Sequence, residues 1–240
     1  MVTLLELKNQ IAANPDVEFC CCANLNLYDS TTLDRLATQA VAGRQLRIMD
    51  LPADAGSHSA IHVTLCEDDY PGWIAVEDLD VLDIAETAYR PVLVNEAEIR
   101  DRLPNVIHYT HLAMQQPNHY LWGGTVGPNY DCSGLMQAAF LSVGVWIPRD
   151  AYQQHAFTSP VSLDDAMPGD LVFFGNDQRI THVGLYLGDR RYIHSSGKEI
   201  GRNGIGIDEL SAESGPVSHV YLKQFKRLGR LGRSYSGKTH

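Results

Sequence analysis

The sequence predicts an α+β chain in two parts, a small β-barrel followed by a domain of helices and strands. Residues 1–84 contain short stretches in which apolar and polar residues alternate, a period typical of strands with one buried face. Over residues 133–144 the apolar residues recur instead at helical spacing, and a β-hairpin is predicted after them at 181–195. We expect the second domain at 101–235, joined to the first by a linker at 85–100.

Four stretches predict the strands of the first domain, and they read EFCCCANLNLY, RQLRIMDL, AIHVTLCED and GWIAVEDLDVL. Turn residues separate them, as in a small barrel. A short amphipathic helix is predicted before them, because Leu4, Leu7 and Ile11 fall on one helical face. This segment does not resemble a signal peptide, since its apolar run is short and contains Glu6 and Lys8.

Two helical stretches, 96–103 and 106–115, are predicted after the first domain. We expect them to be separate helices, because Pro104 lies between them and proline interrupts helices. Pro91 bounds the first of them in the same way.

The charge of the chain narrows the classes of partner. Its net charge is −10, which argues against nucleic acid because phosphate binding needs concentrated Lys and Arg. Residues 223–240 are the exception, since they contain no acid. We expect this tail to be a solvated or frayed end. Its basic residues are Lys223, Lys226, Arg227, Arg230, Arg233 and Lys238.

The five cysteines indicate a reduced, cytoplasmic protein. Their number is odd, no signal peptide is recognised, and no apolar run is long enough to span a membrane. Cys20, Cys21 and Cys22 lie in a predicted strand, where we expect them to act as small buried hydrophobes.

Cys132 is the cysteine whose surroundings in the sequence indicate a reactive thiol. It lies in YDCSGLMQAAFLSVG, at the start of the helix predicted from Ser133, and Gly144 is suited to end that helix. The helix dipole and the unpaired amides at a helix N-terminus favour an anion. We therefore expect the pKa of the Cys132 thiol to be lowered, as in reactive cysteines.

The hairpin at 181–195 supplies a candidate base. A loop at Gly188–Arg190 places His182 one diagonal step from His194 on the neighbouring strand, within about 7–8 Å. A two-residue loop gives nearly the same neighbourhood. Gly184 lies beside them and leaves room. If the Cys132 helix packs on this face, a thiol, a base and a group that orients the base come together.

Two chemical interpretations of this set remain open. The first is a cysteine nucleophile with a histidine base, which needs no cofactor. The second is a zinc site of the Cys-His-His type with an open position.

The order of motifs resembles the NlpC-type cell-wall peptidase family, which has a papain-like fold with an antiparallel sheet packed on helices. The motifs are YLWGG, DCSGL, VWIPRDAYQQ, PGDLVFF, HVGLYLG and YIHSS. The resemblance implies Cys132 as nucleophile and His182 as general base. It also implies His194 as the residue that orients the base and Tyr120 as a group that holds the oxyanion.

The stretch DDYPGWIAVEDLDVL resembles the end of a bacterial SH3-like domain. Family members with this arrangement cleave the γ-D-glutamyl-diamino acid bond of peptidoglycan stem peptides that have a free N-terminal L-Ala. The resemblance implies Asp131 and Asp150 as partners of the substrate ammonium, although Asp150 in PRD is also suited to cap the next helix. It implies that Ser133, Trp122 and Tyr70 line the pocket.

The expected substrate is the stem peptide L-Ala-γ-D-Glu-diaminopimelate. A cytoplasmic enzyme restricted to free N-termini suits the recycling of imported peptides, with no membrane and no protein partner required. The alternatives are an acyltransferase that has the same fold and forms a thioester, and a non-catalytic protein that binds the cell wall.

Overall fold

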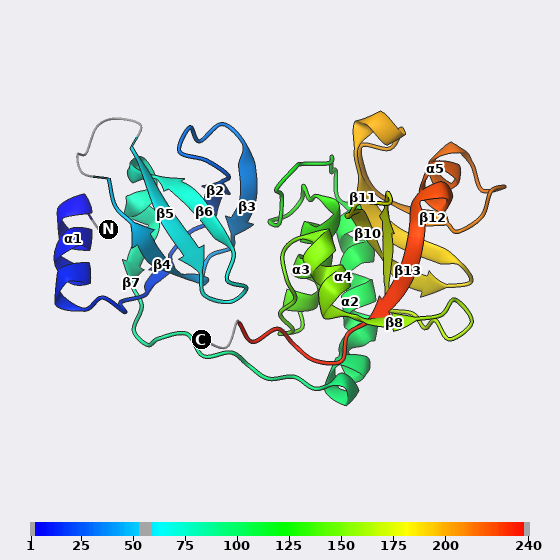
Figure 1. Ribbon diagram of the computed structural model, residues 1–240, viewed down its shortest axis with the longest axis horizontal. Coiled ribbons are helices and arrows are strands. Elements are labelled where there is room, and N and C mark those ends of the chain that lie inside the picture. Colours follow the sequence, from blue (N-terminus) through cyan, green and yellow to red (C-terminus); the bar gives the residue numbers. More distant parts are fainter. Residues whose placement is uncertain (1–2, 53–58, 238–240) are drawn as a thin grey trace. The chain divides into compact units, whose positions relative to one another are not determined.

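A computed structural model describes residues 3–52 and 59–237 of the chain (Figure 1). The chain divides into two units, Met1–Pro91 with Ser236–His240 and Val92–Tyr235. Within the described residues, no helix is both long enough and apolar enough to cross a membrane. The sulfurs of all five cysteines are free of disulfide bonds.

The first unit contains one helix and a seven-stranded antiparallel sheet (Figure 1). Its elements are α1 (Leu4–Ala13), β1 (Phe19–Cys21), β2 (Leu25–Tyr28), β3 (Leu36–Ala40), β4 (Gln45–Asp50), β5 (Ala60–Leu65), β6 (Pro71–Ala75), the 3-10 helix η1 (Val76–Val81) and β7 (Leu82–Ile84). The strands follow the order β3-β2-β6-β5-β4-β1-β7.

The predicted N-terminal helix is confirmed as α1. Thr3 caps it by accepting a hydrogen bond from the Glu6 amide at 3.2 Å, and the Glu6 side chain accepts one in return from the Thr3 amide. Leu7 is fully buried, and Leu4 and Ile11 pack against the same core.

The predicted strands are present, but two of the stretches are divided. EFCCCANLNLY forms β1 and β2, and GWIAVEDLDVL forms β6, η1 and β7. Strand β3 was not predicted, because LATQA lacks the large apolar residues that mark the other strands. Alternate residues of β5 are buried, among them Ile61, Val63 and Leu65.

The second unit packs helices against a six-stranded antiparallel sheet (Figure 1). Its elements are α2 (Glu96–Gln115), α3 (Cys132–Leu141), α4 (Ala151–Phe157), β8 (Ser159–Val161), β9 (Leu171–Gly175), β10 (Ile180–Gly188), β11 (Arg191–Ser196), the 3-10 helix η2 (Lys198–Ile200), β12 (Gly204–Glu209), α5 (Pro216–Gln224) and β13 (Phe225–Arg230). The strands follow the order β12-β11-β10-β9-β13-β8.

The prediction that Pro104 separates two helices is wrong, because α2 continues through it. Proline in a helix interior removes one hydrogen bond and costs about 3 kcal/mol. The helix buries Ile99, Val106 and Ala113 in the core of the unit, at helical spacing. Burial of this apolar face offsets the missing bond.

The prediction of a frayed basic tail is also wrong over most of its length. Residues 225–230 form β13, which lies between β9 and β8 inside the sheet. Arg230 donates hydrogen bonds to both oxygens of the Asp170 carboxylate, at 2.9 and 2.8 Å. Lys238 lies outside the described residues. The basic side chains of the tail therefore hold a strand in place, which composition alone did not indicate.

Candidate active site

Cys132 begins α3, and Asp131 is its N-cap. The Asp131 carboxylate accepts hydrogen bonds from the amides of Gly134 at 2.6 Å and Gly123 at 2.9 Å. The bond from Gly134 satisfies one of the N–H groups that a helix start leaves unpaired, and the bond from Gly123 ties the preceding loop to the cap. Gly134 also has to be glycine, since an added Cβ would lie 2.0 Å from the Gly124 carbonyl oxygen. The DCSG motif thus fixes the start of the helix against the preceding loop.

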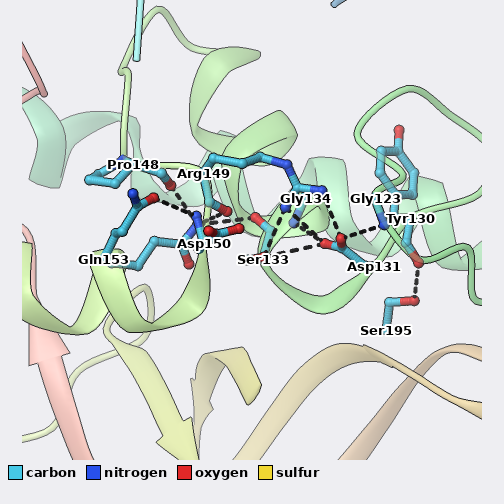
Figure 2. A network of polar contacts seen from close by, with 11 residues as sticks. Gly123, Tyr130, Asp131, Ser133, Gly134, Pro148, Arg149, Asp150, Gln153 and Ser195 are labelled. Carbon is cyan, nitrogen blue, oxygen red and sulfur yellow. Dashed lines mark hydrogen bonds and ion pairs between the residues drawn. The ribbon is translucent and has the colours of Figure 1, made fainter. Parts of the chain in front are cut away.

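Arg149 completes the environment of Asp131. Its guanidinium donates to both carboxylate oxygens, at 3.1 and 2.7 Å, and to Ser133 Oγ at 2.9 Å (Figure 2). Arg149 and Asp131 are both buried, so the pair is a forked, charge-assisted contact in the interior. The contact of Asp131 with a substrate ammonium and the place of Ser133 in the lining of the pocket stay predictions. In this structure, both Asp131 oxygens accept bonds from the protein.

The Cys132 thiol is buried, with 6% of the residue exposed. Burial raises the pKa of Cys132 to about 12, and the neighbouring charge of Asp131 adds to the increase. The prediction of a lowered pKa is therefore wrong, because desolvation outweighs the helix N-terminus. In the resting protein, Cys132 is a neutral thiol.

The β-hairpin forms as predicted, with one irregularity. Leu185 pairs with Ile193 and Tyr186 with Tyr192, which is the register of the three-residue loop, while a bulge at Leu187 lets Gly188 pair with Arg191. Within the described part of the sheet, the β10–β11 ladder pairs no residue before Leu185. The strands stay close at the histidines all the same, since an added Cβ at Gly184 would lie 3.0 Å from the Ile193 carbonyl oxygen.

The start of α3 contacts both strands of this hairpin, β10 and β11. Ser195 Oγ donates a hydrogen bond of 2.7 Å to the Tyr130 carbonyl oxygen, and the backbone of Val183 hydrogen-bonds the Cys132 sulfur. The body of α3 packs on the face that carries Val183, Leu185 and Ile193. The expectation that it packs on the histidine face is therefore wrong.

His182 and His194 contact each other directly across the two strands. His182 Nε2 lies 2.7 Å from His194 Nδ1, and the two rings are perpendicular, with centroids 4.9 Å apart. Gly184 leaves room for them, because an added Cβ would lie 3.1 Å from His194 Cβ. Burial lowers the pKa of both histidines, and the positive charge that His194 would carry lowers that of His182 further.

Asp208 extends this pair to a third side chain. The second ring nitrogen of His194, Nε2, lies 2.8 Å from Asp208 Oδ2, and Arg202 donates to the same oxygen at 2.6 Å. Burial opposes ionisation of Asp208, but the bonds from His194 and Arg202 hold its pKa below the ordinary value. The site therefore contains a continuous row of Arg202, Asp208, His194 and His182.

Two tyrosines lie near the thiol. Tyr221 of α5 stacks on the His182 ring at 4.3 Å and exchanges a 2.7 Å hydrogen bond with Ser196. Tyr120 forms a β-bridge with Tyr130, two residues before Cys132. Burial raises the pKa of both Tyr120 and Tyr221, and a charge on Cys132 raises each further. Both phenols are therefore hydrogen-bond donors at neutral pH.

Three further residues were predicted to contact the substrate, and none of them belongs to the row of Arg202, Asp208, His194 and His182. Trp122 is 53% exposed, on the loop before α3. Asp150 is the N-cap of α4, and its amide donates to Gln153 Oε1 at 3.0 Å (Figure 2). Tyr70 belongs to the first unit, where it packs against the core of that unit. The substrate contacts expected of all three stay predictions.

The zinc interpretation does not suit the donor geometry. Two imidazole ligands of one ion each direct a nitrogen lone pair at the metal, whereas His182 Nε2 and His194 Nδ1 share a hydrogen bond with each other. Across residues 3–52 and 59–237, no three His, Cys, Asp or Glu side chains are grouped so that they could hold a metal.

Asp208, Arg202 and Tyr221 were missed by sequence reasoning. Strand β12 reads GIGIDE, with Gly206 opposite His194 and Asp208 opposite Tyr192. An acid on the same face of the strand as Gly206 is a signal that could have indicated Asp208. Nothing local indicates Tyr221, because its place depends on the packing of α5.

Comparisons with known proteins agree with the fold and the motifs. Residues 117–224 match the NlpC/P60 family, and residues 27–79 match the family described as the bacterial dipeptidyl-peptidase Sh3 domain. The predicted α+β fold, papain-like with an SH3-like domain ahead of it, is thereby confirmed.

Three known proteins illustrate the similarity. The gamma-D-glutamyl-L-lysine dipeptidyl-peptidase of Bacillus subtilis (strain 168) is 46% identical over 86 residues, 34% of this chain and 29% of that protein. The bifunctional muramidase/DL-endopeptidase CwlT of the same organism is 44% identical over 81 residues, 32% of this chain and 25% of that protein. A crystal structure of an NlpC/P60 family protein from Bacillus cereus ATCC 10987 has a TM-score of 0.48 and 21% identity, covering 93% of this chain and 66% of that one.

The match spans less than a third of the length of either curated relative. The residues that match the NlpC/P60 family, 117–224, contain the DCSG helix and the histidine hairpin. The chain carries an NlpC/P60 domain at residues 117–224, preceded by a bacterial SH3 domain at residues 27–79.

Proposed function

We propose that this protein is a cysteine peptidase that hydrolyses the bond between γ-D-glutamate and the diamino acid of peptidoglycan stem peptides. The observation that carries the proposal is the hydrogen-bonded histidine pair, His182 and His194, on the two strands that contact the start of the Cys132 helix. A thiol, a base and a residue that orients the base are the parts that nucleophilic acyl transfer needs. The name of one relative, gamma-D-glutamyl-L-lysine dipeptidyl-peptidase, describes a bond of this class.

The first half of the reaction forms a thioester. Cys132 Sγ attacks the γ-carbonyl carbon of D-Glu while His182 takes the thiol proton. The Cys132 amide and the Tyr120 hydroxyl donate hydrogen bonds to the oxyanion. The C–N bond then breaks, and the His182 imidazolium gives its proton to the departing amine of the diamino acid.

The second half regenerates the enzyme. Water attacks the thioester carbon as His182 accepts one of its protons, and the C–S bond breaks to release L-Ala-D-Glu. The proton on His182 returns to the Cys132 sulfur. Because burial raises the pKa of Cys132 to about 12 and lowers that of His182, both groups are neutral before substrate binds. Proton transfer therefore accompanies the attack.

We also propose that the enzyme requires a free N-terminal L-Ala on the stem peptide. Its role would be the recycling of such peptides. An ammonium group in a partly closed site needs a carboxylate partner. Asp150 is the candidate in the second unit, since it is only half-buried at the start of α4. Asp131 is the second candidate, although it is already paired with Arg149.

The test is mass spectrometry of L-Ala-γ-D-Glu-meso-diaminopimelate incubated with the protein, beside the same peptide acetylated at its N-terminus. We expect release of L-Ala-D-Glu from the free peptide only, and no release by Cys132→Ala. Cleavage of both peptides would keep the peptidase and remove the ammonium pocket. Substantial turnover by Cys132→Ala would refute the nucleophile.

Two further outcomes distinguish the alternatives. Transfer of the L-Ala-D-Glu group to an added amine in preference to water would indicate the acyltransferase. If neither peptide is cleaved but the protein sediments with peptidoglycan sacculi, the binding function is correct and the peptidase is not. The same peptide with L-Lys in place of diaminopimelate identifies the preferred diamino acid.

A further inference from the structure

Asp208 is held by three polar groups, although nothing in the proposed reaction uses it directly. Its Oδ2 accepts from Arg202 Nη2 at 2.6 Å and lies 2.8 Å from His194 Nε2. Its Oδ1 accepts from Ser218 Oγ at 3.1 Å. Only 7% of the residue is exposed. A buried carboxylate with this many donors is ionised, so it can only accept hydrogen bonds.

Strand β12 is built to let Arg202 reach this carboxylate. Gly206 pairs with His194 on the neighbouring strand, and an added Cβ at Gly206 would lie 2.0 Å from Arg202 Nη1. The guanidinium therefore crosses the strand where there is no side chain. Arg202 keeps Asp208 charged and so prevents the proton of His194 from moving to it.

The hydrogen bonds then determine where the protons lie on both imidazoles. Since the Asp208 carboxylate only accepts, His194 must carry its proton on Nε2. A neutral His194 has a bare Nδ1, which accepts, so the atom that faces it at 2.7 Å, His182 Nε2, must donate. A neutral His182 protonated on Nε2 has a free lone pair on Nδ1.

From this geometry we infer that Asp208 is a positioning residue, which selects the Nε2–H tautomer of both histidines and so leaves His182 Nδ1 as the basic atom. Tyr221 supports this by stacking on His182 at 4.3 Å, which fixes the plane of the ring. The inference rests on the proposed function, in which His182 takes the Cys132 proton. It extends the Cys-His-His set to a fourth residue that never touches the substrate.

The sharpest test replaces the acceptor with a donor of the same shape. Because Arg202 donates to the same oxygen that faces His194, it is removed as well. In the double variant Arg202→Met with Asp208→Asn, the amide NH2 can donate to His194 Nε2, which moves the His194 proton to Nδ1. His182 Nε2 must then accept, and its proton moves to Nδ1, so the base is blocked. We expect kcat to fall by a factor on the order of 10³–10⁴, as when a triad carboxylate is replaced by its amide, with KM changed little.

The tautomer of each histidine distinguishes a positioning role of Asp208 from a merely structural one, because loss of a structural contact would not shift the ring protons. In ¹⁵N-histidine-labelled protein, two-bond ¹H–¹⁵N spectra at pH 7 report which ring nitrogen is protonated, and His182→Gln and His194→Gln assign the signals. We expect Nε2–H for both rings in the unmodified protein and Nδ1–H for both in the double variant Arg202→Met with Asp208→Asn. An Nδ1–H tautomer of His182 in the unmodified protein would overturn the inference without any variant having to fold.

Glu209→Gln is the matched control, because it makes the same chemical change one residue along β12, on the opposite face of the strand. It should keep the tautomers and the activity of the unmodified protein. Full activity in the double variant Arg202→Met with Asp208→Asn, or an equal loss in Glu209→Gln, would refute the role of Asp208. If the unmodified protein cleaves no stem peptide, the proposed function fails, while the spectra still decide whether Asp208 sets the tautomers.

Discussion

The guanidinium of Arg149 donates two hydrogen bonds to the carboxylate of Asp131, and the residue that follows this carboxylate is Cys132. Both charged side chains are buried, and only 1% of Arg149 is exposed. The same carboxylate accepts the amides of Gly123 and Gly134. The position of the thiol is therefore tied to an ion pair in the interior of the domain.

Removing one partner of this ion pair should destabilise the domain strongly. Arg149→Met leaves the Asp131 charge buried without its counterion, which costs about 3–5 kcal/mol. Urea unfolding should show this loss in the free energy of unfolding. The double variant Asp131→Asn with Arg149→Met should be less destabilised than Arg149→Met alone, because no charge then remains buried. A double variant that loses as much as the sum of the single changes would contradict the coupling.

Alkylation of Cys132 should follow the ionisation of a thiol with a raised pKa. Since burial raises the pKa of Cys132 to about 12, the rate with iodoacetamide should rise about tenfold per pH unit from pH 7 to 10. Cys22 is exposed and reacts as well, so the rate is read from the peptide that contains Cys132 by mass spectrometry. A rate that is already constant below pH 7 would indicate a thiolate–imidazolium pair at rest.

Local patterns predicted the elements that are locally determined. The helix from Cys132 and the hairpin with its turn at 188–190 follow from apolar spacing and turn residues, and both are present. Pro104 and the basic tail were misjudged for the same physical reason. Whether α2 continues, or whether β13 joins a sheet, depends on the core against which each segment packs. Local sequence patterns do not show this packing against the core.

In the candidate site, too, locally determined features could be predicted and features that depend on tertiary packing could not. The approach of His182 to His194 could be predicted, because a hairpin register fixes it. The ionisation of Cys132 could not, since the depth of burial has the largest effect on its pKa and sequence patterns do not show it. Asp208 lies on a third strand, whose position beside β11 depends on tertiary structure.

Acid should destabilise the second unit through its buried histidines. Burial lowers the pKa of His182 and His194 in the folded state, whereas the unfolded chain binds protons near pH 6.5. The unfolded state therefore takes up protons that the folded state excludes. As the pH falls below about 6.5, the free energy of unfolding should decrease by about 1 kcal/mol per pH unit for each histidine.

His182→Gln checks this assignment, because it removes one of the two titrating groups. Its free energy of unfolding should depend less steeply on pH between 6.5 and 5 than that of the unmodified protein. Urea unfolding at several pH values measures both slopes. Equal slopes would mean that other groups cause the acid sensitivity.

Gly184→Ala should disturb the base without touching the nucleophile. An added Cβ would lie 3.0 Å from the Ile193 carbonyl oxygen and 3.1 Å from His194 Cβ, so His194 must move by a few tenths of an ångström. Because small displacements of catalytic groups are costly, we expect kcat to fall about tenfold with KM little changed. Gly232→Ala is the control, since an added Cβ there has open space and should leave kcat unchanged. If Gly184→Ala keeps full activity, the spacing between the two histidines tolerates more movement than their 2.7 Å contact implies.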